Sequence, residues 1–227
     1  MIVPGEIIRD SKIELFFGTK YDAVDESSPN HKFLNQDHSG EAFLLIDKKH
    51  KTSDLKVDAI VTTLHDINLC IRSADCIPIL IYDNYNDIIA AIHAGWRGAS
   101  AEIIQNTINL IESIGGNAAT MNVFIGPCIR RNSYEVSEEV LQAFSNVDNS
   151  SRKFFKTYKD AKFLFDLPGY CKYVLCTLGV SVDNIIDSSL DTFLYPDLFY
   201  SYRYYKKNKI ELQKGQRQIS MIKLIKT

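Results

Sequence analysis

The residues best suited to chemistry lie in one short segment, His93-Ala94-Gly95-Trp96-Arg97-Gly98, between a run typical of a strand and a run typical of a helix. Backbone N–H groups at the start of a helix have no partner within it, and an arginine adds a planar fork of donors. The segment therefore predicts an anion site, built from Arg97 and the helix start after Gly98. The alternative is a tight turn in which Arg97 makes a structural ion pair.

A second unusual segment is Arg72-Ser73-Ala74-Asp75-Cys76, where charged side chains and a thiol interrupt an apolar region. Arg72 is a further candidate ligand for the anion. In a regular strand Asp75 and Cys76 would point to opposite faces, but a turn at Asp75, ahead of Pro78, would remove this restriction. Cys76 alone would be a small buried hydrophobic residue, so a chemical role requires a partner.

His38, within Gln36-Asp37-His38-Ser39-Gly40, supplies such a partner from a loop just before the first clear strand. His38, Cys76 and His93 are too far apart for a zinc finger, but each lies near a strand end, and strand ends can meet at one edge of a sheet. Two imidazoles and a thiolate leave a tetrahedral Zn²⁺ ion one open position, as catalytic zinc sites require. The same donors also suit Cu²⁺.

Hydrophobic patterns predict the elements that must position these residues. Short runs rich in Ile, Leu and Val predict the strands of a central sheet, at 42–46, 59–63, 67–72, 77–82 and 88–92. Apolar residues at helical spacing predict a helix that Ser100 caps at its start and that Gly115-Gly116 ends. A strand at 121–125 is expected after this helix. Further helices are expected from Ser137 and from Pro168.

The stretch 88–125 thus predicts a strand–helix–strand unit, with ligands at the carboxyl end of its first strand. No linker or repeat divides the chain, so we predict a single domain over residues 1–227. The fold class is α/β, with a central mixed sheet flanked by helices. The segment 149–162 is either a mobile loop over a site or a surface loop held by Phe154 and Phe155.

Composition narrows the function further. The 227 residues carry 26 basic and 28 acidic side chains, a formal charge of −2, so no nucleic-acid partner is expected. Five cysteines without a CxxC pair favour reduced thiols, and no targeting or membrane-spanning segment is evident. We expect a soluble, cytoplasmic protein, and predict neither a membrane nor a protein partner.

Several segments, in order along the chain, resemble the signature motifs of one protein family. They are Ala74-Asp75-Cys76-Ile77-Pro78, the His93 segment, Ile125-Gly126-Pro127-Cys128-Ile129 and Tyr134-Glu135-Val136. Weaker similarity covers 36–39 and, near the C-terminus, 199–203 with Gly215, Arg217 and Gln218. In order and spacing these segments resemble the YfiH family, also described as the multicopper polyphenol oxidase or laccase-domain family.

The resemblance implies an α/β sandwich of the YfiH type and a metal site of His38, Cys76 and His93. Family members have been described as copper-dependent phenol oxidases and later as zinc enzymes that cleave purine nucleosides with phosphate, alongside adenosine deamination. The implied function is therefore a zinc-dependent purine nucleoside phosphorylase. Its substrates would be small molecules, namely inorganic phosphate with adenosine, inosine or methylthioadenosine.

This hypothesis assigns roles to six residues. The expected catalytic residues are Cys76, His93 and Asp75. The expected ligands of substrate or phosphate are Arg72, Arg97 and Tyr134, because phosphorolysis requires an anion to be held beneath the sugar. Asp75 and Tyr134 would carry protons or only anchor turns.

Three alternatives remain open at this point. The protein could be a copper-dependent phenol oxidase, or a metal-free hydrolase whose nucleophile Cys76 is activated by His93 or His38. It could also be a metal-bearing domain that binds a partner protein. Four departures from the family pattern are expected to affect substrate binding more than the metal. They are Ser39 and Arg130, each in place of Gly, Asp191 in place of Cys, and Tyr204 in place of Arg.

Overall fold

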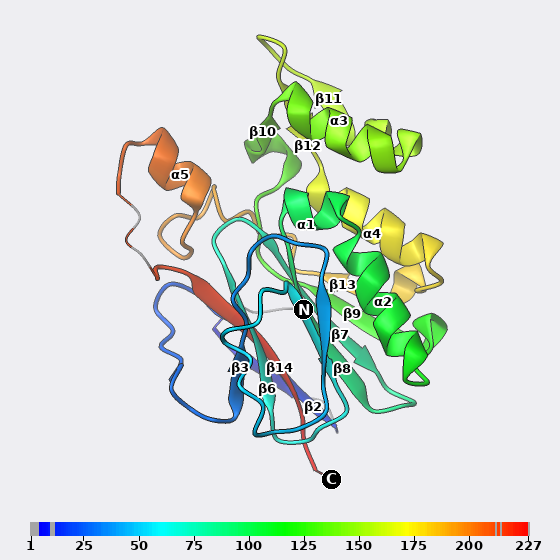
Figure 1. Ribbon diagram of the computed structural model, residues 1–227. Coiled ribbons are helices and arrows are strands. Elements are labelled where there is room, and N and C mark those ends of the chain that lie inside the picture. The colour runs from blue at the N-terminus through cyan, green and yellow to red at the C-terminus, as the bar shows by residue number, and fades with distance from the viewer. Residues whose placement is uncertain (1–4, 10–11, 212, 214, 227) are drawn as a thin grey trace.

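A six-stranded mixed sheet forms the middle layer of the molecule (Figure 1). The computed structural model describes residues 5–9, 12–211, 213 and 215–226. The strands of this sheet are, in order, β13 (Ile185–Asp187), β9 (Met121–Ile125), β7 (Ile77–Asp83), β8 (Ile88–Ala94), β5 (Ala59–Thr62) and β4 (Ala42–Leu45). The outer pairs β13–β9 and β4–β5 are parallel and the inner pairs are antiparallel. The predicted mixed sheet is thus confirmed.

A second sheet covers one face of the middle sheet. Its strands are, in order, β1 (Ile7–Arg9), β2 (Ile13–Phe17), β14 (Gln218–Leu224), β6 (Asn68–Ser73) and β3 (His31–Phe33). Side chains of both sheets form one buried cluster, which includes Leu15, Leu69, Leu80 and Ile222. The strand predicted at 67–72 therefore exists as β6 but belongs to this second sheet, a correction to the prediction of one central sheet.

Helices cover the other face of the middle sheet (Figure 1). They are α1 (Trp96–Ser100), α2 (Ile103–Ser113) and α4 (Leu167–Thr177), and α3 (Glu138–Val147) lies beyond α1 at the end of this layer (Figure 1). Side chains of β7 alternate between the two faces of the middle sheet. Ile79 and Ile81 pack against the helices, and Leu80 and Tyr82 pack against the second sheet. Because both faces are covered, β7 and β8 are buried along their whole length and consist mostly of apolar residues. Within the described ranges, no helix is long and apolar enough to cross a membrane.

The boundary between β8 and the helices differs from the prediction. Helix α1 begins directly after Gly95 rather than after Gly98, and Ser100 ends it, with its Oγ donating to the Arg97 carbonyl at 3.0 Å. The predicted capping role of Ser100 is therefore wrong. The chain breaks at Glu102, whose φ is +61°, and α2 starts afresh at Ile103. Strands β8 and β9 still form the predicted unit, with β7 between them.

A small third sheet extends the helical layer at one end (Figure 1). Its strands are β10 (Glu135–Val136), β12 (Phe163–Phe165) and β11 (Phe155–Thr157). The Phe155 ring stacks on Phe165 with centroids 4.0 Å apart, and Phe154 meets Tyr170 edge-on at 5.7 Å. The interpretation of 149–162 as a segment held by two phenylalanines is confirmed. The predicted helix from Pro168 begins one residue earlier, where Asp166 accepts the Gly169 N–H at 3.1 Å.

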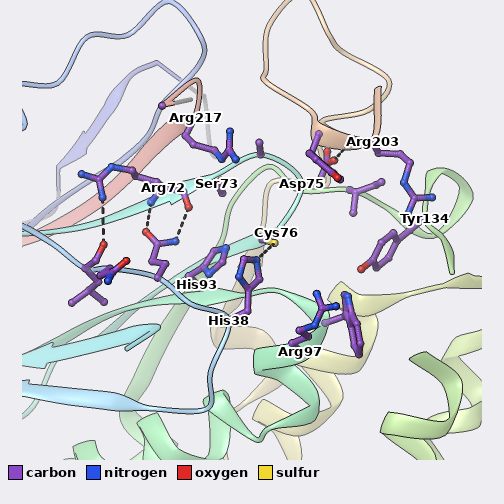
Figure 2. A pocket seen from close by; sticks show the side chains of 18 residues that line it. His38, Arg72, Ser73, Asp75, Cys76, His93, Arg97, Tyr134, Arg203 and Arg217 are labelled. Atoms are coloured by element: carbon purple, nitrogen blue, oxygen red, sulfur yellow. Dashed lines mark hydrogen bonds between the residues drawn. The ribbon is translucent and has the colours of Figure 1, made fainter. Parts of the chain in front are cut away.

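Three chain segments that carry chemistry reach one end of the two sheets. His93 is the penultimate residue of β8, and the chain bends through residues 74–76 between β6 and β7. The loop after β3 brings His38 to the same place (Figure 2). The ends of the strands, rather than their faces, therefore build the site.

Replacing Phe165 by alanine tests the packing beneath this end of the molecule. Phe165 is fully buried and lies 4.7 Å from the Phe144 ring as well as against Phe155. Phe165→Ala should lower the free energy of unfolding by about 3 to 5 kcal/mol, because the cavity left behind cannot close completely. Denaturant titration followed by circular dichroism measures this change.

Tyr85→Ala is the matched control, since the Tyr85 side chain is 79% exposed. Its free energy of unfolding should change by less than about 0.5 kcal/mol. Equal stability of the two variants would show that the small sheet does not contribute to the cooperative core.

Candidate metal centre and active site

His38, Cys76 and His93 lie together at the end of the sheets (Figure 2). One ligating atom from each residue lies within 4.8 Å of those of the other two. The Cys76 Sγ is 3.8 Å from His38 Nε2, and the two imidazole centroids are 4.9 Å apart. The structure thus brings together the three residues that the sequence singled out as metal ligands.

The bend at Asp75 places Cys76 in this cluster. Asp75 has φ +90°, so the chain leaves the extended conformation where the sequence required a turn. Its buried carboxylate accepts the Thr192 hydroxyl and the Arg203 backbone N–H, both at 2.7 Å. Burial raises the pKa of Asp75, and these hydrogen bonds oppose that rise. The contacts favour the interpretation of Asp75 as the anchor of the bend.

Close backbone approach between the His38 loop and the β8–α1 turn depends on glycine. A Cβ atom on Gly95 would lie 2.9 Å from His38 Cδ2 and 3.0 Å from the Cys76 Sγ. A Cβ atom on Gly40 would overlap the Ala101 carbonyl oxygen at 2.0 Å. A side chain at either position would push the two segments apart, so these glycines let the loop pack against the break between α1 and α2.

A buried carboxylate orients His93. Asp58 is fully buried, immediately before β5, and its Oδ1 accepts the His93 Nδ1–H at 2.6 Å. Its Oδ2 accepts the backbone N–H groups of Ser39 at 2.8 Å and Asp37 at 3.2 Å. Because Nδ1 is occupied, the Nε2 atom of His93 is free to bind a metal. Carboxylates commonly hold ligating histidines in this way.

The charges of the clustered side chains depend on one another. Burial by itself would raise the pKa of Cys76, but His93 and His38 lower the pKa of this thiol to about 6. Burial by itself would lower the pKa of His93, but the Cys76 thiolate and Asp58 raise it to about 9. Without a metal, the pair at neutral pH is therefore a thiolate beside an imidazolium. A thiolate is the form of cysteine that binds metals and attacks electrophiles.

The donor set fits a tetrahedral transition metal. Zinc bonds of about 2.0 to 2.3 Å place neighbouring donor atoms about 3.6 Å apart. The 3.8 Å separation of Cys76 Sγ and His38 Nε2 is close to that value, and small side-chain movements would close the remaining distances within the cluster. Three protein ligands leave one position open toward the cavity. The residues present therefore fit a metal site of the catalytic type.

The cluster opens into a cavity of about 610 Å³ that Arg97 and Trp96 also line. The Arg97 guanidinium carbon lies 4.4 Å from the Trp96 ring centroid, which holds this exposed side chain beside the cavity. Arg97 makes no ion pair with any residue in the described part of the chain. Its donors are therefore available to a ligand, as the predicted anion site requires.

Tyr134 forms another wall of the cavity. Its ring lies between Phe165, with centroids 6.0 Å apart, and the Arg203 guanidinium at 5.6 Å, and its hydroxyl points into the cavity (Figure 2). Burial raises the pKa of this hydroxyl, and the nearby Cys76 thiolate adds to the effect. Tyr134 therefore keeps its proton and can donate a hydrogen bond at neutral pH.

Arg72 lines the cavity but already has a partner. Its guanidinium forms an ion pair with Glu26 and lies 4.1 Å from the Phe33 ring centroid. Its backbone N–H donates to the Gln36 side chain at 2.9 Å, which ties the start of the His38 loop to β6. The sequence did not predict the Glu26 pair. Arg97, which has no carboxylate partner in the described residues, is the better placed of the two arginines.

Two of the four departures from the family motifs, Arg130 and Asp191, lie outside this cavity. Arg130 makes paired hydrogen bonds to the Asp187 carboxylate at 2.7 and 2.9 Å, and Asp191 accepts the Ser133 hydroxyl at 2.7 Å. Neither residue lines the cavity. The expectation that they affect the substrate pocket is therefore wrong, because both side chains are used to hold turns around β13.

Sequence reasoning missed several residues of the site. Asp58 directly precedes β5, but Glu41 and Asp87 precede β4 and β8 in the same way, so no signal in the sequence singled it out. Arg203 and Arg217 were part of the C-terminal motifs but were given no role, and both line the cavity. Ser73 also lines it, and its buried hydroxyl has no hydrogen-bond partner within the described ranges. These polar groups face the space where a substrate would bind.

A graded series of variants tests the metal site. Cys76→Ala, His38→Ala and His93→Ala should each abolish tight binding of one transition-metal ion per chain, because each removes a ligand. Asp58→Asn should weaken binding by about 10- to 100-fold, since it removes no ligand but disturbs the positions of His93 and of the His38 loop. Elemental analysis and competition with a chelator measure these effects.

Cys176→Ser is the control, because Cys176 is an exposed cysteine outside the cluster. It should bind metal as the unmodified protein does. Full metal content in Cys76→Ala would show that the ligand set is different.

Solved structures share this fold. The hypothetical protein YfiH of Bacillus licheniformis superposes with a TM-score of 0.83 at 22% identity, covering 94% of this chain and 93% of that one. At this identity the likeness shows the fold alone.

Curated relatives are more similar in sequence. Purine nucleoside phosphorylases of Rickettsia conorii and Rickettsia prowazekii are 36% and 32% identical over 62% and 75% of this chain, and over 58% and 69% of their own lengths. An adenosine deaminase from an unknown prokaryotic organism is 31% identical over 65% of this chain and 57% of its own length. The match to two of these three proteins thus spans less than two thirds of their length. The family model described as multi-copper polyphenol oxidoreductase laccase matches residues 21–224, so the chain belongs to this family.

Proposed function

We propose that this protein is a zinc-dependent purine nucleoside phosphorylase with adenosine deamination as a side activity. The observation that carries the proposal is one cavity shared by the His38–Cys76–His93 cluster and the unpaired Arg97. Phosphorolysis needs both features, because an anion must be held while charge develops on the leaving base. The names of the Rickettsia relatives and of the adenosine deaminase support the same choice.

His38, Cys76 and His93 would hold the zinc ion. A zinc ion with one open position acts there as a Lewis acid toward oxygen. Asp58 keeps His93 in the tautomer that presents Nε2 to the cavity. Cys76 and His93 thus contribute to catalysis as ligands, and Asp75 contributes as the anchor that fixes the position of Cys76.

Arg97 and Tyr134 would handle the reacting groups. The guanidinium of Arg97 matches two phosphate oxygens at once and would hold the phosphate below the anomeric carbon of the sugar. A bond then forms between a phosphate oxygen and that carbon while the bond from the carbon to the base nitrogen breaks. The leaving base gains negative charge, which a hydrogen bond from the protonated Tyr134 hydroxyl would stabilise, and it takes up the proton that the phosphate gives up on becoming an ester. The products are ribose 1-phosphate and the free base.

The alternatives demand features that the described residues supply less well. A multicopper oxidase passes electrons between several metal ions, and the described residues contain one cluster of three or more ligating side chains. A metal-free cysteine hydrolase is compatible with the lowered pKa of Cys76. Metal analysis distinguishes this hydrolase from the proposed phosphorylase. The hydrolase would be purified without zinc, and its Cys76 thiol would react rapidly with alkylating agents.

Phosphate dependence tests the proposed reaction. Adenosine or inosine should release free base only when inorganic phosphate is present, with ribose 1-phosphate formed in equal amount. Chromatography of the products measures both. Base release at the same rate without phosphate would indicate hydrolysis, and faster oxidation of phenols with added copper would favour the oxidase.

Arg97→Lys tests the phosphate ligand. An ammonium group offers a point charge instead of a planar fork, so the phosphate concentration for half-maximal rate should rise about ten- to hundredfold. Zinc content and unfolding midpoint should stay unchanged. Steady-state kinetics at varied phosphate concentration measures the shift.

Arg131→Lys is the matched control, since Arg131 pairs with Asp166 outside the cavity. Its phosphate requirement should not change. If Arg97→Lys behaves in the same way, then the phosphate is held by Arg72 or another residue.

A further inference from the structure

The cavity beside the His38–Cys76–His93 cluster is called the metal cavity here. A second cavity of about 460 Å³ lies next to it. Helix α5 (Tyr202–Lys207) forms one wall of this second cavity, which we call the α5 cavity. Leu164 of β12 and the nearby Tyr158 also line it. Tyr202 and Arg203 line both cavities. The two cavities therefore adjoin at these two side chains.

The α5 cavity is rich in unneutralised positive charge. Lys206 and Lys207 line it, and neither lysine has a carboxylate partner among the described residues. The Arg203 guanidinium bonds the Glu135 backbone carbonyl at 2.7 Å, so its charge also stays unpaired. Glu135 is the single acidic residue among those described as lining the cavity. Three cations against one carboxylate favour an anionic occupant.

Aromatic rings hold the lysines in place. The Lys207 ammonium lies 5.2 Å from the Phe193 ring centroid, and the Lys206 ammonium lies 5.9 Å from that of Tyr202. Both rings belong to the lining of the same cavity. A cation held over a ring loses less conformational freedom when it binds an anion than a lysine extended into solvent. Lys206 and Lys207 thus form part of the cavity lining in defined positions.

We infer that the α5 cavity binds an anionic group attached to the substrate, so that this protein accepts purine nucleosides phosphorylated at the 5′ end. The inference rests on the proposed function, because it places the purine nucleoside in the metal cavity. The sugar would lie near His38 and Cys76, and the 5′ phosphates would extend past Arg203 to Lys206 and Lys207. A free anion could contact the same lysines, but a phosphate attached to a bound nucleoside is present there at a higher effective concentration.

Calorimetric titration of the zinc-loaded full chain with adenosine and with adenosine 5′-diphosphate tests this inference. The diphosphate should bind at least about tenfold more tightly, because it adds charge-assisted contacts. The double variant Lys206→Gln/Lys207→Gln should lose this advantage and keep the affinity for adenosine. Adenosine titrated in the presence of inorganic phosphate should not reproduce the advantage, which separates a tethered phosphate from a free one.

Lys48→Gln/Lys49→Gln is the matched control, since these lysines line a different cavity and the charge change is the same. It should bind the diphosphate as the unmodified protein does. Equal affinity of the unmodified protein for both ligands, or an advantage that survives in Lys206→Gln/Lys207→Gln, would overturn the inference.

Measuring phosphorolysis of adenosine distinguishes a failure of the α5 cavity inference from a failure of the proposed function. Phosphorolysis of adenosine without any gain from the diphosphate would refute the α5 cavity alone. Lysine-dependent binding of the diphosphate without any phosphorolysis would refute the proposed reaction and retain the anion site.

Discussion

The carboxylate of Asp58 is the interaction on which the site depends. One oxygen fixes the ring of His93, and the other accepts backbone N–H groups on either side of His38. A single buried group therefore positions both histidines, one through its side chain and one through its loop. A buried carboxylate without such donors would strongly destabilise the fold. Because the folded state requires these hydrogen bonds to Asp58, the relative position of the two imidazoles is fixed when the chain folds.

Coverage of both faces of the middle sheet explains why the chemistry lies at its end. Residues along β7 and β8 are used by the helices on one side and by the second sheet on the other, so no polar side chain can gather on either face. At the strand ends the chain turns. The positive φ angles of His38 and Asp75, +64° and +90°, belong to the turns that bring the His38 and Cys76 side chains together. Hydrogen bonds hold both turns in these less common backbone angles. The Ser39 N–H donates to Asp58 next to His38, and the Thr192 hydroxyl donates to Asp75.

The sequence predicts local elements well and their partners less well. Apolar runs located β4, β5, β7 and β8 to within about two residues, because a strand buried on both faces has a continuous hydrophobic signature. Strand β6 carries the same signature, so the pattern could not show that it pairs with β14 in another sheet. The three clustered ligands were found because cysteine and histidine are chemically distinctive. Asp58 and Glu26 were not, since aspartate and glutamate are common and only tertiary contacts reveal their partners.

The position of β14 in the middle of the second sheet has a consequence for the order of folding. Ile222 pairs with Leu15 at one edge of β14 and with Leu69 at the other, so residues from both extremes of the described chain must meet before this sheet is complete. Such non-local pairing raises the contact order and slows folding. Gln218 pairs with Ser73, the last residue of β6 before the bend that carries Cys76. During synthesis on the ribosome, Cys76 would therefore leave the exit tunnel long before β14, the strand that pairs beside its turn.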